Sequence, residues 1–285
     1  MSFTETVALG ALAGFTIYLG LPLARLQLLG TKTRIALAMF AVGVLAFLFV
    51  DVIAAGLHIL EEAVEGFKDG DESLGHALGL LALMAGGFFL GSAGLAIVER
   101  WIRPANMTLP PAAGGEVGEL ALSSQQLMAE TEAANRRALY TGLTIAGAIG
   151  LHNFAEGLAI GVSAQSGAIS LATVLIIGFA LHNATEGFGI IGPLGGLRPS
   201  WKWIGLAGFI GGAPTFLGSM VGYNVTSEPL ELAFYSLAGG AILYVIGEVW
   251  QGMRRYGHRE LGLYMLSLGF FVAVATEMVV EYASA

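Results

Sequence analysis

Eight apolar stretches dominate this chain, and each is long enough to cross a lipid bilayer as a helix. A spanning helix needs about 20 mostly apolar residues, and it must satisfy its own backbone hydrogen bonds because the hydrocarbon core offers no partners. The sequence therefore predicts an all-α, polytopic membrane protein that forms a single domain over residues 1–285. Its eight spans are expected at roughly Val7–Leu28, Ile35–Leu60, Leu74–Val98, Ala138–Ser163, Ile169–Ile191, Trp203–Tyr223, Leu230–Gln251 and Leu261–Val280.

The composition supports this class and argues against several others. Hydrophobic residues make up 55% of the chain and charged residues only 12%, whereas soluble domains carry about 25% charged residues. A net charge of −8 without a basic stripe argues against nucleic-acid binding. The chain contains no cysteine, which excludes disulfides, thiolate metal ligands and cysteine nucleophiles.

The basic residues predict the orientation of the bundle. Of the 13 Lys and Arg residues, all but Lys68 flank the first, third, fifth and seventh connections. The positive-inside rule makes that side cytoplasmic, so both termini are expected outside the plasma membrane. The third connection, over residues 100–137, would be a polar cytoplasmic loop or short amphipathic segment that separates three helices (7–98) from five (138–280).

Few ionisable side chains lie inside the predicted spans. Each costs at least about 2.5 kcal/mol at the bilayer centre and usually marks a functional site. They are Asp51 in the second span, His152 and Glu156 in the fourth, His182 and Glu186 in the fifth, and Glu248 in the seventh. Almost no Lys or Arg is available in the spans, so these carboxylates must be protonated or hold a cation.

The fourth and fifth spans carry two copies of one motif. Residues 151–157 read Leu-His-Asn-Phe-Ala-Glu-Gly, and residues 181–187 read Leu-His-Asn-Ala-Thr-Glu-Gly. In each copy the His and the Glu are four residues apart, so they lie on one face of a helix. Neutral imidazole and carboxylate are metal ligands, and the duplication argues against a merely structural pair. Asn153 and Asn183 could ligate through their amide oxygens or form hydrogen bonds between helices.

The two motif copies are expected at a shared depth in the bilayer. Consecutive spans are antiparallel, and reflection through the connection near Ser166 places His152 level with His182. Glu156 then lies about one turn toward the outside and Glu186 about one turn toward the inside. This arrangement predicts a short ladder of ligands, which suits transport because an ion must both bind and leave. Asp51 is expected close to the depth of Glu156.

Other polar residues could belong to an entry or exit pathway. His58 lies near the outer end of the second span and could line the entrance or face the lipid headgroups. Glu277 is a weaker candidate for the entrance, and Glu248 could receive the ion on its way to the cytoplasm. The predicted outer side is rich in Asp and Glu and could concentrate cations, although such loops are often acidic without a function.

These features together resemble the ZIP (Zrt/Irt-like) family of divalent-metal transporters. The eight spans, the outer termini and the long connection between the third and fourth spans match that family, as do both His-x-x-x-Glu pairs and the stretch that begins at His58. The resemblance implies that His152, Glu156 and Glu186 are central ligands. It also implies that Asn153, His182 and Asn183 complete or flank the site, that Asp51 stands at the family's ligand position in the second span, and that Glu248 lies on the exit path.

The chain departs from the family pattern at three positions. Ala155 and Thr185 stand where members commonly have a proline, which puts the expected helix kinks in doubt. Ala213 stands before Pro214 where some members have a Glu that bridges a second metal ion. A single transport site is therefore the expectation.

The sequence thus predicts transport of a divalent metal ion toward the cytoplasm, zinc first, with iron, manganese and cadmium as further cargo. The partners expected are this ion and the bilayer, with a homodimer left open, and no catalytic cofactor is expected. The alternatives are an intramembrane metalloenzyme that uses the same ligands and a proton-coupled carrier of another solute. The enzyme is disfavoured because the chain has no His-Glu-x-x-His or Glu-x-x-His motif.

Overall fold

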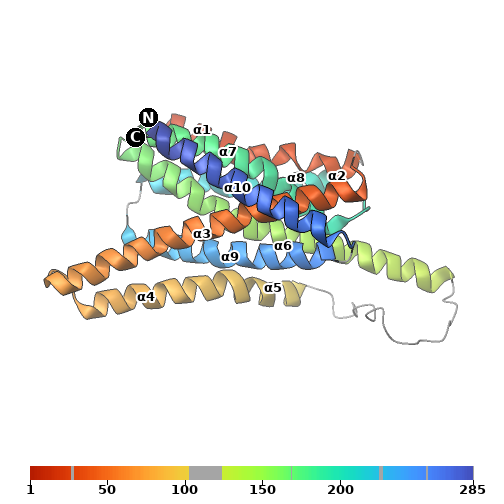
Figure 1. Ribbon diagram of the computed structural model, residues 1–285, viewed down its shortest axis with the longest axis horizontal. Helices are drawn as coiled ribbons and strands as arrows, with labels where there is room; N and C mark the ends of the chain where they lie inside the picture. The colour runs from red at the N-terminus through yellow and green to blue at the C-terminus, as the bar shows by residue number, and fades with distance from the viewer. Residues whose placement is uncertain (27–28, 103–123, 168, 225–226, 255, 285) are drawn as a thin grey trace.

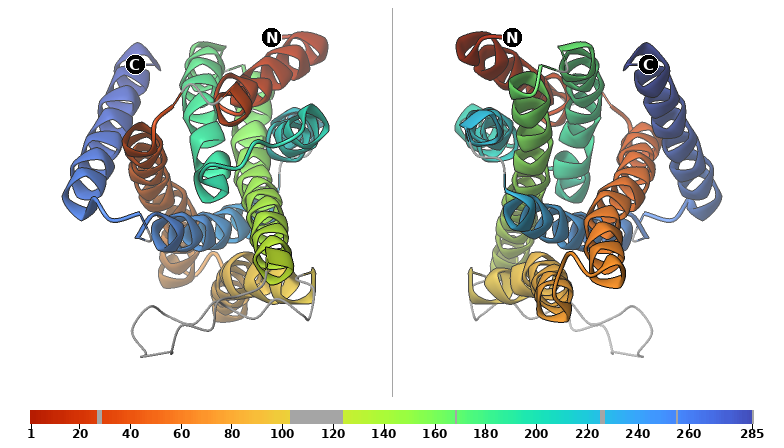
Figure 2. Two further views of the ribbon diagram at one scale, coloured as in Figure 1. Left: turned by 90° about the vertical axis from the view of Figure 1, so that its right-hand side faces the viewer. Right: turned by 90° about the vertical axis from the view of Figure 1, so that its left-hand side faces the viewer.

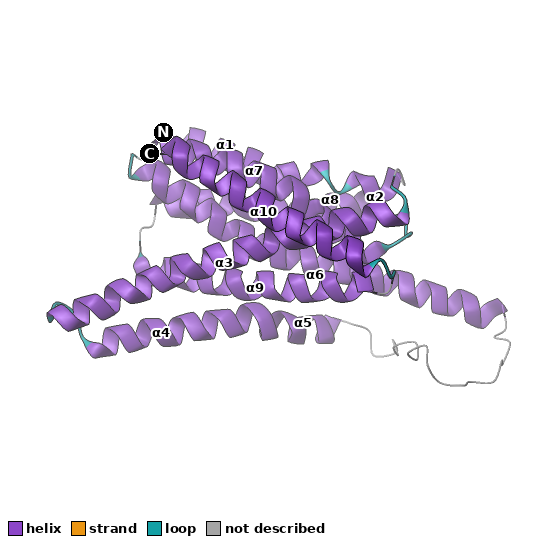
Figure 3. Cartoon of the chain, in the orientation of Figure 1, coloured by secondary structure: helices purple, strands orange, loops and turns teal. Residues whose placement is uncertain are grey.

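The computed structural model describes residues 1–26, 29–102, 124–167, 169–224, 227–254 and 256–284. This part of the chain consists of helices joined by turns, without a strand (Figures 1 and 3). In chain order the elements are α1 (Phe3–Phe15), η1 (Thr16–Leu19), α2 (Pro22–Leu26), α3 (Thr31–Asp69), α4 (Leu74–Phe89), η2 (Leu90–Gly94), α5 (Leu95–Ile102), α6 (Ser124–Gln165), α7 (Ile169–Ile191), η3 (Gly192–Leu194), α8 (Trp201–Asn224), α9 (Glu228–Arg254) and α10 (Arg259–Ser284).

Eight helical segments among the described residues are long and apolar enough to span a membrane, which confirms the predicted number. Each overlaps one of the apolar stretches identified in the sequence. The segments are Phe3–Leu26, Thr31–Asp69, Leu74–Trp101, Met128–Gln165, Leu175–Leu194, Trp201–Asn224, Glu228–Arg254 and Arg259–Val279.

Two helices are much longer than the apolar stretches that predicted them. α3 has 39 residues and α6 has 42, so at 1.5 Å per residue each is roughly 60 Å long, about twice the thickness of a bilayer core. The connection expected over residues 100–137 is correspondingly shorter, because α5 ends at Ile102 and α6 begins at Ser124. The first turns of α6 are rich in Gln, Glu, Ala and Arg, which are good helix formers although they are not apolar.

The helices differ greatly in how deeply they are buried. In an apolar stretch of 18 residues within α6, 72% of the residues are buried. The corresponding share is 6% in the α4–α5 segment and 17% in α10. Figure 2 shows α10 and α4–α5 on the outside of the bundle. Both termini and the α3–α4 turn lie at one end, which we name the terminal end, and the α9–α10 turn lies at the opposite end (Figure 1). A residue in the middle of α6 is therefore enclosed on most sides.

Glycines allow α6 and α8 to approach each other closely. A Cβ added at Gly157 would collide with the backbone carbonyl of Thr215 in α8, and one added at Gly218 would collide with the carbonyl of Phe154 in α6. Gly187, at the same place in the second motif copy, packs in the same way against Gly20 beside the N-terminal helices. The glycine that ends each motif therefore brings a neighbouring backbone close to the His and Glu of that copy.

We expect Gly218→Ala to lower the thermal stability of the purified protein in detergent. The added methyl group must push α6 and α8 apart, and overpacking of this kind costs about 1–3 kcal/mol. Gly205→Ala on the same helix is the matched control, because a Cβ there meets no atom within 4 Å. Equal melting temperatures for the two variants would contradict close packing of α6 against α8.

Candidate metal centre

The His and Glu residues of both motif copies lie in the interior of the bundle. The exposed fraction is 1% for His152 and 5% for Glu156 in α6, and 6% for His182 and 0% for Glu186 in α7. Both helices pass through the motif as uninterrupted α-helices. The i to i+4 spacing therefore places each pair on one face, as expected from the sequence.

The four side chains form a linear series of contacts. His152 Nε2 lies 3.1 Å from Glu156 Oε1 and 4.0 Å from Glu186 Oε1. His182 Nδ1 lies 3.7 Å from Glu156 Oε1. The order is thus Glu186, His152, Glu156, His182. Within the described residues, no group of three or more His, Asp or Glu side chains is arranged so that it could hold a metal ion as it stands.

Apart from the His–Glu contacts just described, most polar atoms of this series have no hydrogen-bond partner in the described part of the protein. They are both ring nitrogens of His152 and His182, both carboxylate oxygens of Glu156, and Oε1 of Glu186. A buried polar atom without a partner costs about 1–3 kcal/mol, and no described Lys or Arg forms an ion pair with either Glu. A group that supplies positive charge and accepts lone pairs would satisfy these atoms, and a divalent metal ion has both properties.

Asn153 holds Glu186 in place. Its Nδ2 donates a 3.1 Å hydrogen bond to Glu186 Oε2 and a 2.9 Å hydrogen bond to the backbone carbonyl of Gly211 in α8. The amide therefore links three helices, while its Oδ1 is buried without a partner. Such supporting hydrogen bonds orient a ligating carboxylate.

Asn183, at the same position of the second copy, has a different partner. Its Nδ2 donates a 3.1 Å hydrogen bond to the backbone carbonyl of Ala13 in α1. This bond ties α7 to α1. Its Oδ1 is also buried without a partner, so each Asn combines a hydrogen bond between helices with an unpaired oxygen.

Asp51 lies at the edge of the series. Its side chain is exposed, yet it interacts electrostatically with His152, His182 and Glu156.

The other pathway candidates lie outside this series. His58 is 72% exposed in its side chain and lies 3.5 Å from the Glu62 carboxylate one turn further along α3. Glu248 in α9 and Glu277 in α10 are half-buried.

The departures from the family pattern have clear structural counterparts. Ala155 is buried in continuous helix, and Thr185 Oγ1 donates a 2.8 Å hydrogen bond to the carbonyl of His182. The backbone at these positions therefore stays helical. Pro214 lies inside α8, preceded by the buried Ala213, which supplies no ligand.

A cavity of about 270 Å³ between α6, α7 and α9 was not anticipated from the sequence. It is lined by Ala159 and Ser163, which lie one and two turns beyond Glu156 toward the terminal end, and by Glu231 and Tyr235 of α9. Tyr235 interacts electrostatically with both Glu231 and Asp51. Glu231 stands in the first turn of α9 among other acidic residues, so its sequence position did not distinguish it from a solvated surface charge.

Comparison with known proteins identifies the same class. The family model described as "ZIP Zinc transporter" matches residues 115–246, which include both motif copies. The zinc transporter ZupT of Clostridium perfringens (strain 13 / Type A) is 28% identical over 234 residues, which cover 77% of this chain and 80% of that protein. The chain is therefore similar to the ZIP zinc transporters over residues 115–246, and to ZupT over most of its length.

Proposed function

We propose that this protein carries a divalent transition-metal ion, zinc first, across the membrane through the series Glu186, His152, Glu156 and His182. The observation that carries this proposal is the set of buried imidazole and carboxylate groups of α6 and α7, which contact one another and have no Lys or Arg partner among the described residues. The clostridial relative is named as a zinc transporter, which supports zinc as the first cargo. Mixed imidazole and carboxylate ligands also suit Fe²⁺, Mn²⁺ and Cd²⁺.

The linear order of the ligands suits movement of a metal ion through the protein better than tight retention of the ion. An ion held by neighbouring pairs can exchange one partner at a time, and conduction requires binding that is not too tight. Asn153 would hold Glu186 during the exchange, with Asn183 flanking the site. Ala213 contributes no carboxylate, so we infer one transported ion instead of a bridged pair.

The entry route we propose leads through the cavity between α6, α7 and α9. Glu231 would attract the cation at its mouth, and Asp51 would join it to Glu156 and His182. His58 and Glu277 would belong to the outer rim at most. On the other side the ion would leave Glu186 for the half-buried Glu248.

The direction follows from the distribution of basic residues. Because the Lys and Arg residues cluster at the connections on one side, the positive-inside rule places the terminal end outside the cell and the opposite end in the cytoplasm. Transport from the Glu231 cavity toward Glu186 is then uptake across the plasma membrane. The helices before and after α6–α7 would rock as two units in alternating access.

Uptake into liposomes tests this function directly. We expect the wild-type protein to admit Zn²⁺ and Cd²⁺, and the variant His152→Ala/Glu186→Ala to admit neither above the level of empty liposomes. Metal flux that persists in this variant would show that the ion takes another route. A protein that moves no metal but hydrolyses a substrate in a zinc-dependent way would support the metalloenzyme alternative.

We expect Glu231→Gln to slow zinc uptake about tenfold at low ionic strength, with a smaller effect at high salt, because a charged mouth raises the local cation concentration. Glu72→Gln, in the exposed α3–α4 turn, is the matched control. Initial rates of uptake at two salt concentrations measure the effect. Equal slowing in both variants would mean that the acidic surface as a whole attracts the ion, without a specific role for the cavity.

A further inference from the structure

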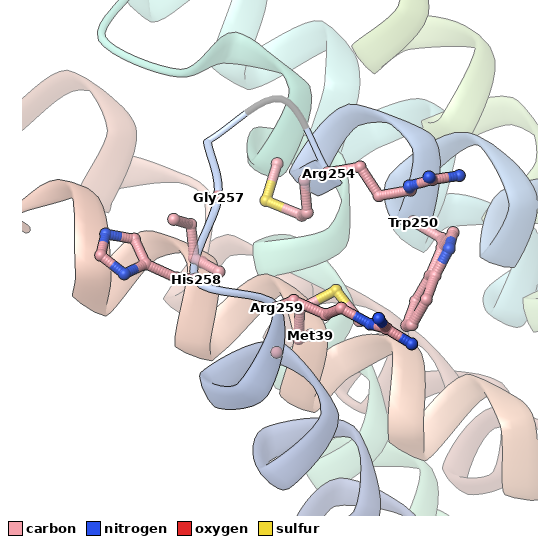
Figure 4. Close-up of a pocket in the computed structure, with 9 residues that line it drawn as sticks. Met39, Trp250, Arg254, Gly257, His258 and Arg259 are labelled. Carbon is pink, nitrogen blue, oxygen red and sulfur yellow. The ribbon is translucent and has the colours of Figure 1, made fainter.

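A second cavity lies at the opposite end of the bundle, far along the chain from the metal series. Its volume is about 540 Å³, and it is bounded by the beginning of α3, the end of α9 and the beginning of α10 (Figure 4). Cavities of about 300–1,000 Å³ are typical of small-molecule sites. Ile35, Met39, Trp250 and Met253 make an apolar wall, and Arg254 and Arg259 supply the charge.

The two arginines come from opposite sides of one tight turn. Gly257 and His258 both have positive φ angles, 71° and 55°, and this conformation reverses the chain between α9 and α10. Figure 4 shows the side chains of Arg254 and Arg259 extending toward Trp250, whereas the His258 ring points away from them. The turn therefore presents two guanidinium groups to the same side of the cavity.

These guanidinium groups have no anionic partner within the described residues. No Asp or Glu lines the cavity, and neither arginine makes an ion pair with a described carboxylate. Other basic residues at this end are used differently: Arg25, for example, donates to the carbonyl of Pro199 and stacks over Trp201. Among the described residues, these two exposed arginines at one cavity thus form a positive site without a carboxylate partner.

The chemistry of the lining matches a phosphate group attached to an apolar body. Guanidinium groups bind phosphate oxygens through paired, charge-assisted hydrogen bonds. Tryptophan is favoured at the membrane interface because its ring is amphipathic. Basic pockets between transmembrane helices on the cytoplasmic side suit the headgroups of anionic lipids, and an apolar wall next to the arginines would contact the glycerol and upper acyl chains.

We propose that this cavity binds the phosphate group of an anionic phospholipid from the cytoplasmic leaflet. The assignment to the cytoplasmic leaflet rests on the proposed orientation of the protein. The binding of the lipid does not depend on metal transport. A lipid seated there would touch α3, α9 and α10 at once, and so would hold together three helices that surround the inner end of the bundle.

The test compares lipid binding to the full-length protein in detergent by native mass spectrometry. Phosphatidylglycerol and phosphatidylcholine are the two lipid probes, and inorganic phosphate in excess is the third. We expect phosphatidylglycerol to bind preferentially, and Arg254→Gln/Arg259→Gln to weaken its binding roughly tenfold or more, the effect of losing charge-assisted hydrogen bonds. Arg136→Gln/Lys202→Gln removes the same charge from exposed positions at the same end, outside the cavity lining, and should bind like the wild type.

Each outcome has a definite meaning. If only the cavity variant loses its preference for phosphatidylglycerol, the proposal is supported. If inorganic phosphate displaces the lipid and the protein retains no lipid, the ligand of the cavity is free phosphate instead of a phospholipid headgroup. Equal binding by the cavity variant and the wild type would overturn the proposal, as would an equal loss in the control pair. Arg254→Lys/Arg259→Lys, which keeps both charges, separates loss of the phosphate site from misfolding because it should retain part of the preference. Zinc flux is not a readout, so this test can fail while the transport proposal stands.

Discussion

Glu156→Gln is expected to abolish zinc uptake together with the stabilisation of the protein by zinc. Glu156 contacts both histidines of the series through Oε1, at 3.1 Å and 3.7 Å, and its Oε2 is buried without a hydrogen-bond partner in the described structure. Loss of a residue that supports a metal ligand typically lowers metal affinity or activity about 10–100-fold. Loss of the ligand itself should therefore reduce uptake by more than about 100-fold.

Two measurements on one sample check this expectation. Zinc should raise the melting temperature of the wild type, because a ligand at 100 times its Kd stabilises by about 2.7 kcal/mol, and this rise should be lost in Glu156→Gln. Glu62→Gln is the matched control, since its side chain is 64% exposed on α3 and pairs only with His58 in the described structure. A Glu156→Gln protein that keeps both zinc uptake and zinc-induced stabilisation would remove Glu156 from the site.

Asn153→Ala is expected to lower both transport and stability. The substitution removes the amide that holds Glu186 and that donates a side-chain hydrogen bond to the carbonyl of Gly211. We expect uptake to fall 10–100-fold, as for other residues that orient a metal ligand, and the free energy of unfolding to fall by about 1–3 kcal/mol because buried acceptors lose their partner. Initial uptake rates and thermal melting in detergent measure the two effects.

Asn183→Ala distinguishes the two roles of Asn153, which are to hold Glu186 and to join neighbouring helices. It also loses a hydrogen bond between helices, to Ala13, but Asn183 makes no hydrogen bond to a Glu in the described structure. Its loss of stability should therefore resemble that of Asn153→Ala, with a smaller loss of uptake. If both variants lose uptake to the same extent, the position of Glu186 is not what Asn153 contributes.

Sequence reasoning succeeded where local composition alone decides the outcome. The number of spans follows from apolar length because a bilayer core excludes unpaired backbone groups, and eight candidate spans are present in the described chain. The pairing of His152 with Glu156 follows from helical spacing. The ends of the helices were harder to predict. Residues 124–137 are polar, so hydropathy assigned them to a connection, whereas their helix propensity extends α6 through them.

Features that depend on distant parts of the chain were not predictable in detail. Nothing in the motif distinguishes the partner of Asn153, in α8, from that of Asn183, in α1. The cavity lined by Glu231 and Tyr235 requires three helices to meet at one end. The unpaired Arg254 and Arg259 read in sequence as ordinary cytoplasmic charges, since the positive-inside rule accounts for basic residues at that end without assigning them a ligand.

The sequence by itself determined that this chain is a bundle of membrane helices with two His-x-x-x-Glu pairs, because bilayer thickness and helical periodicity act on neighbouring residues. Only the tertiary structure decided that the pairs align as Glu186, His152, Glu156 and His182, with Asp51 at the edge and His58 apart from them. The physical reason is packing: the glycines that end each motif set how closely α8 and the N-terminal helices approach α6 and α7. That approach depends on backbone surfaces more than 50 residues away in the chain.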